Sequence, residues 1–342
     1  MNPDLEFRLL NDYQHDFPLV AAPFAAMAAA LGVSETDVLA TLARLQERGT
    51  VSRVGAVVRP RSIGASTLAA LAVPEGELER VAQLVSAYPE VNHNYQREHH
   101  YNLWFVVAAP DELALQRVLR EIEERSGCRV LYLPLVEDYH IDLGFDLTGV
   151  RSKRALHVET HAGGAPRPYA PTPAERHLIA AIQSGLPLVA RPFAAAGAQA
   201  GMSEAEALAA LQNRLDCGVI KRMGVVVRHH ELGYRANAMV VWDIPDDRVS
   251  ALGCCVGKFD FVTLCYRRPR RLPAWRYNLF TMIHGQDRDE VLSLVAQLKE
   301  RCGLRDIAHE VLFSRRRFKQ CGARYVADAA PQQAAPRNVA SG

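Results

Sequence analysis

The chain contains two copies of one sequence pattern, and this repeat constrains its fold more than any other feature. Residues 17–59, FPLVAAPFAAMAAALGVSETDVLATLARLQERGTVSRVGAVVR, align without a gap with residues 186–228, LPLVARPFAAAGAQAGMSEAEALAALQNRLDCGVIKRMGVVVR. Further along, NYQR (94–97) returns as CYRR (265–268), and YNLWF (101–105) returns as YNLFT (277–281). A chain that repeats one unit in this way is expected to build two similar halves that pack together.

Each copy begins with a pattern that is typical of a winged helix-turn-helix. Three short helical segments come first, and Ser34 or Ser203 is placed to cap the third, with acidic residues in its first turn. Gly49 or Gly218 ends that helix, and the β-rich VGAVVR or MGVVVR follows as the wing. Both copies therefore predict the same small helical unit.

The remainder of each copy predicts a βαββαβ unit, which is the ferredoxin-like arrangement. Its elements are expected at 65–73, 75–87, 91–97, 101–108, 111–126 and 129–136, and again at 234–244, 246–257, 260–268, 276–284, 287–302 and 305–314. The predicted fold class is α+β: two tandem copies of a winged helix-turn-helix followed by a ferredoxin-like domain, forming a pseudo-dimer. The expected boundaries are 1–60 and 61–150 for copy 1, 151–175 for a linker, 176–229 and 230–326 for copy 2, and 327–342 for a disordered tail.

The composition and the first residues of the sequence predict the cellular location of the protein and whether its cysteines are free thiols. The acidic start MNPDLEFRLL lacks the pattern of a secretory signal, and the apolar stretch 17–33 is interrupted by two prolines, so a cytoplasmic protein without a membrane span is expected. Seven cysteines without a CxxC pair predict free thiols, with neither a disulfide framework nor a metal site.

Charge patterning argues against a DNA-binding role for the helical units. Residues 1–150 carry 12 basic against 21 acidic side chains, whereas residues 167–342 carry 25 against 16, so the two halves are expected to dock or to hold an anion. A winged helix followed by a ferredoxin-like domain resembles the Lrp/AsnC family of transcription regulators. However, the third helices, 34–49 and 203–218, hold more acids than bases and lack the cations that neutralise phosphates.

Two hairpins concentrate the side chains that carry chemistry. VNHNYQREHHYNLWFVV (91–107) holds three histidines and an arginine on a strand that is polar on both faces, unlike a strand that only supports a core. Its counterpart TLCYRRPRRLPAWRYNLFTMIHG (263–285) interleaves five arginines with aromatic residues. Forked guanidinium groups beside flat rings suit a planar polyanionic ligand.

HNYQREHHYNLWF and CYRRPRRLPAWRYNLFTMIHG, each after a degenerate Lrp-like winged helix, resemble the two subunit types of the siroheme decarboxylase family, here in one chain. The resemblance covers nearly the whole sequence. It implies that the protein removes two acetate carboxyl groups of siroheme to give 12,18-didecarboxysiroheme, in haem d1 or alternative haem biosynthesis. It also implies no cofactor beyond the iron that siroheme carries.

The reaction needs fixed cations and a proton donor that titrates near neutrality. Our hypothesis gives proton transfer to His99 and His93, and it assigns the reacting carboxylate to Arg97 and Tyr95, with His284 acting for copy 2. Further substrate-binding side chains are expected on the wings and on both hairpins: Arg53, Arg59, Tyr101, Asn102, Trp104, Arg222, Arg228, Tyr266, Arg267, Arg268, Trp275, Arg276, Tyr277 and Asn278.

Two departures from the family pattern fall in copy 2. Leu264 stands where a histidine is common, and Arg276 stands where a proline is common, so acid catalysis is expected to be asymmetric between the copies. Two alternatives remain open from the sequence: a ligand-sensing Lrp/AsnC-type regulator, and a tetrapyrrole carrier without catalysis. The sequence also leaves open whether the fused chain forms a homodimer.

Overall fold

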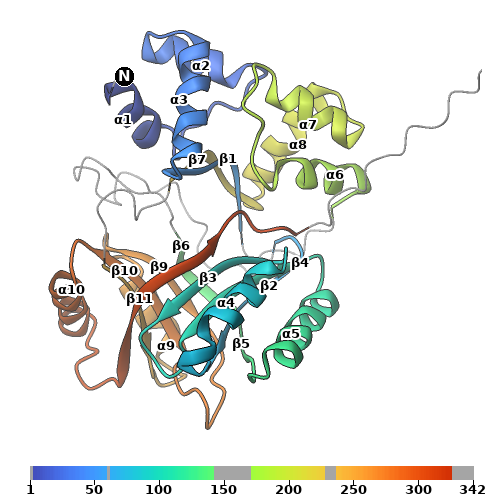
Figure 1. The fold of residues 1–342 in the computed structure, drawn as a ribbon. Coiled ribbons are helices and arrows are strands. Elements are labelled where there is room, and N and C mark those ends of the chain that lie inside the picture. Colours follow the sequence, from blue (N-terminus) through green and yellow to red (C-terminus); the bar gives the residue numbers. More distant parts are fainter. Residues whose placement is uncertain (1–2, 60–61, 142–170, 228–235, 326–342) are drawn as a thin grey trace, which may run out of the picture.

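A computed structural model describes residues 3–59, 62–141, 171–227 and 236–325. Figure 1 shows a helical cap, built from the first part of each copy, above a β-sandwich built from the second part. The cap of copy 1 comprises α1 (Pro3–Asp12), α2 (Pro23–Leu31), α3 (Glu35–Glu47) and β1 (Val51–Val58); copy 2 supplies α6 (Pro173–Ile182), α7 (Pro192–Ala200), α8 (Glu204–Asp216) and β7 (Ile220–Val227).

The predicted caps of the third helices are present in both copies. Ser34 accepts a hydrogen bond from the backbone of Asp37 and completes a capping box with its side chain, and Ser203 does the same with Glu206. The two wing strands pair with each other, β1 antiparallel to β7, so that the two helical units share one hydrophobic core. The cap therefore joins the copies.

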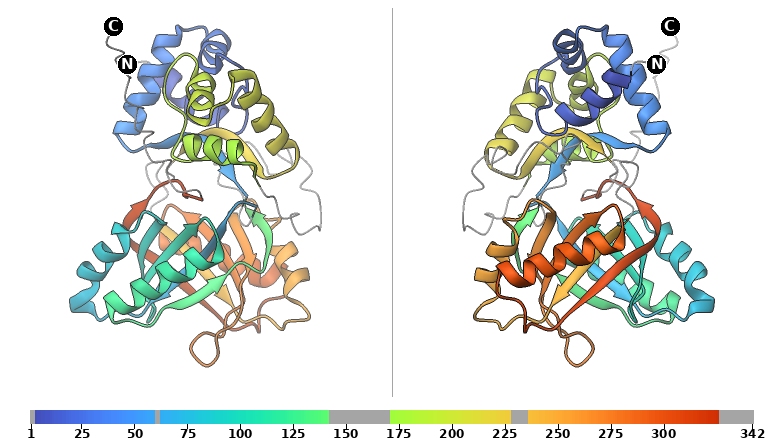
Figure 2. Two further views of the ribbon diagram at one scale, coloured as in Figure 1. Left: turned by 90° about the vertical axis from the view of Figure 1, so that its right-hand side faces the viewer. Right: turned by 90° about the vertical axis from the view of Figure 1, so that its left-hand side faces the viewer.

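Each copy then forms the predicted ferredoxin-like unit. In copy 1 its elements are β2 (Ala65–Leu71), the 3-10 turn η1 (Glu75–Glu77), α4 (Leu78–Ala87), β3 (Val91–Arg97), β4 (Leu103–Ala109), α5 (Glu112–Ser126) and β5 (Leu131–Pro134). In copy 2 they are β8 (Ala236–Trp242), α9 (Val249–Val256), β9 (Val262–Arg267), β10 (Leu279–Gly285), α10 (Arg288–Arg301) and β11 (His309–Gln320). Helices cover the outer faces of both units, as the two side views in Figure 2 show.

The last strand of each copy crosses to the sheet of the other copy, which the sequence did not predict. β11 pairs with β8 through Phe313 and then with β3 from Ser314 to Gln320. The chain after β5 forms β6 (Glu137–Ile141), which pairs with β9. The strand order is therefore β5-β2-β4-β3-β11-β8-β10-β9-β6, and the inner faces of the two units share a core that includes Trp104, Trp275 and Phe280.

Three expectations need correction. Helix α6 begins at Pro173, inside the stretch 151–175 that was expected to be linker, because Thr172 and Glu175 form a capping box. The strand expected at 129–136 is β5, and an unexpected strand, β6, follows it, whereas the strand expected at 305–314 extends to Gln320 as β11. Strands β6 and β11 form because each finds an open edge in the other copy. Cys255 and Cys302 form a disulfide between α9 and α10, so the expectation of free thiols throughout is wrong.

Other expectations fall where the structure gives no description. The tail 327–342 and most of the expected linker, up to residue 170, lie outside the described residues, as does Arg228. Among the described helices, none alone is long and apolar enough to cross a membrane, and only the bent pair α2–α3 reaches that length and composition together.

Candidate functional site

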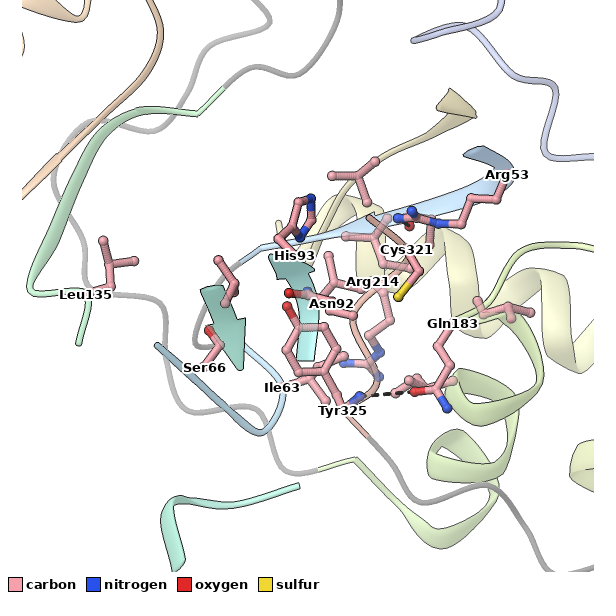
Figure 3. A pocket seen from close by; sticks show the side chains of 18 of the residues that line it. Arg53, Ile63, Ser66, Asn92, His93, Leu135, Gln183, Arg214, Cys321 and Tyr325 are labelled. Carbon is pink, nitrogen blue, oxygen red and sulfur yellow. Dashed lines mark hydrogen bonds between the residues drawn. The ribbon is translucent and has the colours of Figure 1, made fainter. Parts of the chain in front are cut away.

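A cavity of about 310 Å³ lies between the helical cap and the β-sandwich, and both copies line it. Copy 1 contributes residues of β1, β2, β3 and β4, whereas copy 2 contributes α6, α8, β7, β9 and the segment 321–325 that follows β11. Figure 3 shows side chains from these elements pointing toward one another. Its polar lining consists of Arg53, Ser66, Thr67, Asn92, His93, Glu175, Gln183, Arg214, Tyr266, Arg268, Cys321 and Tyr325.

The charge balance of this cavity is positive. Among the described residues that line it, Glu175 is the one acid, and its carboxylate accepts a hydrogen bond of 2.6 Å from Arg214. Arg53 and Arg268 also line the cavity, and neither has an ion-pair partner within the described part of the chain. Guanidinium groups stay charged in proteins, so the two arginines leave an uncompensated positive charge.

Arg53 projects from β1, where its Nη2 donates a hydrogen bond of 3.1 Å to the carbonyl oxygen of Ala56. Its Nε is buried and finds no hydrogen-bond partner among the described residues. Burial lowers the pKa of Arg53, while the nearby Tyr325 and Cys321 act in the opposite direction. The side chain thus retains donors that nothing in the described chain satisfies.

Arg268 enters the cavity from the end of β9. Its Nη1 donates to the carbonyl oxygen of Leu133, and its guanidinium carbon lies 4.5 Å from the centre of the Tyr266 ring. The Nε of Arg268 is buried without a partner in the described structure, and burial lowers the pKa of this group. Aromatic stacking fixes the guanidinium plane and leaves its edge available to an anion.

His93 enters the cavity from β3, on the same lining as the two arginines. Its Nδ1 is buried without a hydrogen-bond partner among the described residues, as is Oδ1 of the neighbouring Asn92. Burial lowers the pKa of His93 to about 4, and the positive charge of Arg53 acts in the same direction. The imidazole is therefore neutral at pH 7 in the ligand-free protein.

Unsatisfied buried polar atoms are costly, and their concentration in one cavity indicates a site for a polar ligand. Here the atoms are guanidinium donors, an imidazole nitrogen and an amide oxygen, with little negative charge of their own. The arrangement suits an anion such as a carboxylate. The polar strand at 91–97 is explained in part, because one of its faces supplies His93 to the cavity and the other packs Asn94 against α4.

His99 does not line this cavity, so the geometry does not support its expected role as proton donor. Its Nε2 donates to Oε2 of Glu310 at 2.8 Å, and its Nδ1 accepts from the backbone N–H of Tyr101 at 2.9 Å. Oε1 of Glu310 accepts from the Tyr277 hydroxyl at 2.6 Å. Both imidazole nitrogens are occupied, so His99 fastens the β3–β4 turn to copy 2.

Arg97 and Tyr95 also lie outside the cavity lining. Arg97 is buried inside the sandwich, where Nη1 donates to the carbonyl oxygen of Leu312 at 3.1 Å and Nη2 lies 3.8 Å from Sδ of Met282. The Tyr95 ring stacks on His93, with 6.2 Å between ring centres. Arg97 is the copy-1 equivalent of Arg268, so the cavity uses the arginine of copy 2 together with the histidine of copy 1.

Most arginines of the second hairpin are bound to acids of copy 2 instead of the cavity. Arg270 and Arg276 donate to the two carboxylate oxygens of Asp243, and Arg267 lies 3.5 Å from Asp246. Asn278 and Asn102 occupy equivalent places, and each exchanges hydrogen bonds with the backbone of Ile244 or Val73. These residues hold the hairpins in shape.

The remaining expected residues fall into the core or the cap. Trp104, Tyr101, Tyr277 and Trp275 pack around one another between the two units. His284 is buried, with Nδ1 facing Asn237 and Nε2 at 2.9 Å from the Thr263 hydroxyl. Arg59 lies 3.8 Å from Asp138, and Arg222 donates to the backbone oxygen of Gln14. None of these side chains lines the cavity.

The sequence did not single out several cavity residues. Ser66, Gln183 and Cys321 carry no motif, Asn92 lies in the polar strand but was not among the expected site residues, and Tyr325 stands two residues before the expected disordered tail. Their common property is spatial, because they come from separate elements of both copies that meet only in the folded protein. A signal did exist for Arg53, which recurs at the matched position of both copies.

Comparisons with known proteins agree with this architecture. Residues 62–140 and 231–319 match the description of an AsnC-like ligand binding domain, and residues 6–51 and 175–221 match that of a siroheme decarboxylase NirDL-like HTH domain. The siroheme decarboxylase NirDL subunit of Paracoccus denitrificans (strain Pd 1222) is 44% identical over 94% of this chain and 97% of its own length. The siroheme decarboxylase of Hydrogenobacter thermophilus is 34% identical, again over 94% of this chain and over 95% of its own length.

Shorter relatives match only one part of the chain, such as the siroheme decarboxylase NirD subunit of Pseudomonas aeruginosa, 55% identical over 43% of this chain. Among solved structures, siroheme decarboxylase NirDL superposes with a TM-score of 0.68 at 31% identity and covers 95% of both chains. The same enzyme in co-complex with an iron-uroporphyrin III analogue gives a TM-score of 0.67 at 30% identity, covering 95% of this chain and 94% of that one.

Proposed function

The chain belongs to the siroheme decarboxylase family, and we propose that it decarboxylates siroheme in the cavity between the helical cap and the β-sandwich. The observation that carries the placement is the group of unpaired polar atoms on Arg53, Arg268 and His93, which face one space from both copies. Siroheme is a planar tetrapyrrole edged with carboxylates, so it supplies the negative charge that these groups lack. The iron belongs to the substrate.

Each turnover converts one acetate side chain into a methyl group. The bond between the methylene carbon and the carboxylate breaks, carbon dioxide leaves, and the electron pair passes to the methylene carbon and the conjugated ring. One proton then adds at the former methylene carbon, which balances the reaction without an oxidant or a reductant. The enzyme must therefore orient the carboxylate and deliver one proton.

We assign proton delivery to His93 because it is the titratable group whose imidazole faces the cavity without a partner in the described chain. In the ligand-free protein, burial and Arg53 keep its pKa near 4. Carboxylates bound at Arg53 and Arg268 reverse the sign of the local charge, and a nearby anion raises the pKa of an imidazole. Substrate binding thus shifts this imidazole toward the protonated form that the reaction requires.

The two arginines have a complementary task. Arg268 is held by Leu133 and by the Tyr266 ring, so its guanidinium is oriented before substrate arrives. Arg53 faces the cavity from the cap. Fixed charges of this kind lose little energy to reorganisation during the reaction, which is the usual origin of electrostatic catalysis. The positions at which siroheme loses its two carboxyl groups, and the haem pathway that the product enters, remain part of the proposal.

A regulatory role in DNA binding has less support. The cations near the third helices of the cap are engaged by acids, since Arg44 donates to Glu6 at 3.0 Å and Arg214 to Glu175 at 2.6 Å. Arg191 likewise pairs with Glu204. Cations bound to carboxylates do not offer the counterion release that drives DNA binding.

The test is anaerobic incubation with siroheme, following successive loss of two carboxyl groups by mass spectrometry. We expect the wild-type protein to form both products. The variant His93→Gln should lower the rate by about 10²- to 10⁴-fold, the usual contribution of a general acid. His99→Gln serves as the matched control, because glutamine keeps a donor for Glu310, and its rate should stay close to that of the wild-type protein.

Siroheme that binds tightly but returns unchanged would instead identify a tetrapyrrole carrier. A shift of the protein's own upstream DNA would favour the regulator. Normal turnover by His93→Gln would contradict the assigned proton donor while leaving the decarboxylase activity intact. The absence of a further cofactor, the cytoplasmic location and the pairing of two fused chains stay predictions.

A further inference from the structure

The segment Cys321–Tyr325 forms one wall of the cavity although it belongs to copy 2. It continues from the part of β11 that crosses to β3, and the backbone N–H of Cys321 donates to the carbonyl oxygen of Asn92 at 2.8 Å. The N–H of Tyr325 donates to Oε1 of Gln183 at 3.1 Å, the bond drawn as a dashed line in Figure 3. The segment is therefore fixed at both ends.

Close packing of the segment explains the glycine at 322. A Cβ atom at this position would lie 2.6 Å from the carbonyl oxygen of Gln183 and 3.4 Å from Nη1 of Arg53. Only a residue without a side chain allows the backbone to approach α6 so closely. This approach brings the backbone of the segment against the Arg53 side chain, and Tyr325 lines the same cavity as Arg53.

The Tyr325 side chain presents a polar group in an apolar setting. It is 8% exposed and packs with Ile63, Ala108, Ile179 and Val219. Within the described part of the chain, its phenol oxygen has no hydrogen-bond partner, although the residue lines the cavity. Burial raises the pKa of Tyr325 to about 12, against the opposing influence of Arg53, so the phenol is a neutral O–H donor at physiological pH.

We propose that Tyr325 is a substrate-positioning residue whose phenol, together with the Arg53 guanidinium, holds one carboxylate of the bound tetrapyrrole. This inference rests on the proposed function and extends it to a residue outside the repeated motifs. Two donor groups converge on the cavity from different copies, one from β1 of copy 1 and one from the end of copy 2. A carboxylate oxygen between them would satisfy both.

The test compares siroheme binding and turnover in the full-length wild-type protein and in Tyr325→Phe, which keeps the ring and removes the hydroxyl. A hydrogen bond to a charged group contributes enough for the dissociation constant to rise about 10- to 100-fold. The melting temperature should stay near that of the wild-type protein, because the ring packing is retained. Tyr88→Phe is the matched control, since Tyr88 is also 8% exposed but packs with the core of the copy-1 unit, away from the cavity.

A dissociation constant for siroheme that is unchanged in Tyr325→Phe would overturn the inference. So would equal weakening in Tyr88→Phe, which would point to a general loss of order. The binding measurement remains readable even if the wild-type protein releases no carbon dioxide, a result that would overturn the proposed decarboxylase activity alone. The two failures are therefore distinguishable.

Discussion

At the scale of the residue, the hydrogen-bond partners of three histidines, His93, His99 and His284, indicate which of them can act on a ligand. His99 uses both nitrogens in the contacts with Glu310 and Tyr101, and His284 lies between Asn237 and Thr263. His93 alone among the three combines a place in the cavity lining with an enclosed nitrogen that has no partner in the described structure. A histidine whose ring nitrogen is still able to form a hydrogen bond is the one expected to take part in the reaction.

The depressed pKa of His93 predicts a specific dependence of stability on pH. In the unfolded chain an imidazole titrates near 6.5, whereas in the folded protein the pKa is about 4. Between these values the unfolded state binds more protons, so the free energy of unfolding decreases as pH falls from 6.5 toward 4 and is insensitive to this group above 6.5. The decrease amounts to at most about 3 kcal/mol.

Urea unfolding at pH 7.5 and pH 4.5, for the wild-type protein and for His93→Gln, measures this effect. The variant lacks the titrating group, so its stability should fall less on acidification. An identical pH dependence in both proteins would show that His93 is solvated in the folded state.

The sequence predicted residues of this site only where a local pattern marked them. Arg53 and Arg268 recur as matched positions in the two copies, and His93 stands out on a polar strand. His99 and Arg97 carry the same local signals, yet they support the hairpin and the sandwich core. Local pattern identifies a residue type that could act, but only the packing of the copies decides which one faces the cavity.

At the scale of the element, the turn that follows α6 positions Arg53. Gly185 has φ +123°, a conformation that L side chains rarely adopt, and a Cβ there would lie 2.9 Å from Cβ of Arg53. The next residue, Leu186, donates its N–H to the carbonyl oxygen of Val54 at 2.7 Å. The backbone of copy 2 thus rests directly on β1.

We expect Gly185→Ala to weaken siroheme binding as well as stability. The change imposes backbone strain of about 1–3 kcal/mol and in addition displaces Arg53. Gly201→Ala is the control, because Gly201 has φ +69° but no atom within 4 Å of the position that a Cβ would take, so it suffers the strain alone. Titration of siroheme and thermal unfolding of both variants give the comparison, and equal binding by the two would contradict the role of the turn.

Elements were the part of the structure that the sequence predicted best, with one systematic exception. The capped helices at Ser34 and Ser203 and the two βαββαβ units follow from periodicity and capping residues. Strand β6 and the second half of β11 were not predicted. A polar strand such as SRRRFKQ is stabilised by a sheet edge that another part of the chain provides. No local signal in the sequence reports such an edge.

At the scale of the whole molecule, the cavity needs both copies. Arg53 and His93 come from copy 1, whereas Arg268 and Tyr325 come from copy 2. Strand pairs β1–β7, β3–β11 and β9–β6 join the copies at three places. Neither copy alone would present the full set of donors.

We therefore expect residues 1–141 and 171–342, produced as separate polypeptides, to associate and to recover siroheme binding and turnover only when they are combined. Each half alone exposes unpaired strand edges and should bind siroheme weakly or aggregate. Co-purification followed by siroheme titration measures this. Native affinity in the isolated second half would contradict a cavity shared between the copies.

The crossing of β11 also bears on how the two copies have diverged. Equivalent positions now hold unlike residues, His93 opposite Leu264 and Ala108 opposite His284. If the two copies were separate polypeptides of such similar shape, two identical copies could pair with each other. The resulting assembly would have an imidazole at both equivalent positions or at neither. Because the two copies are joined in one chain, every molecule contains one copy of each kind. Each copy can therefore acquire its own residues without the risk that two identical copies pair.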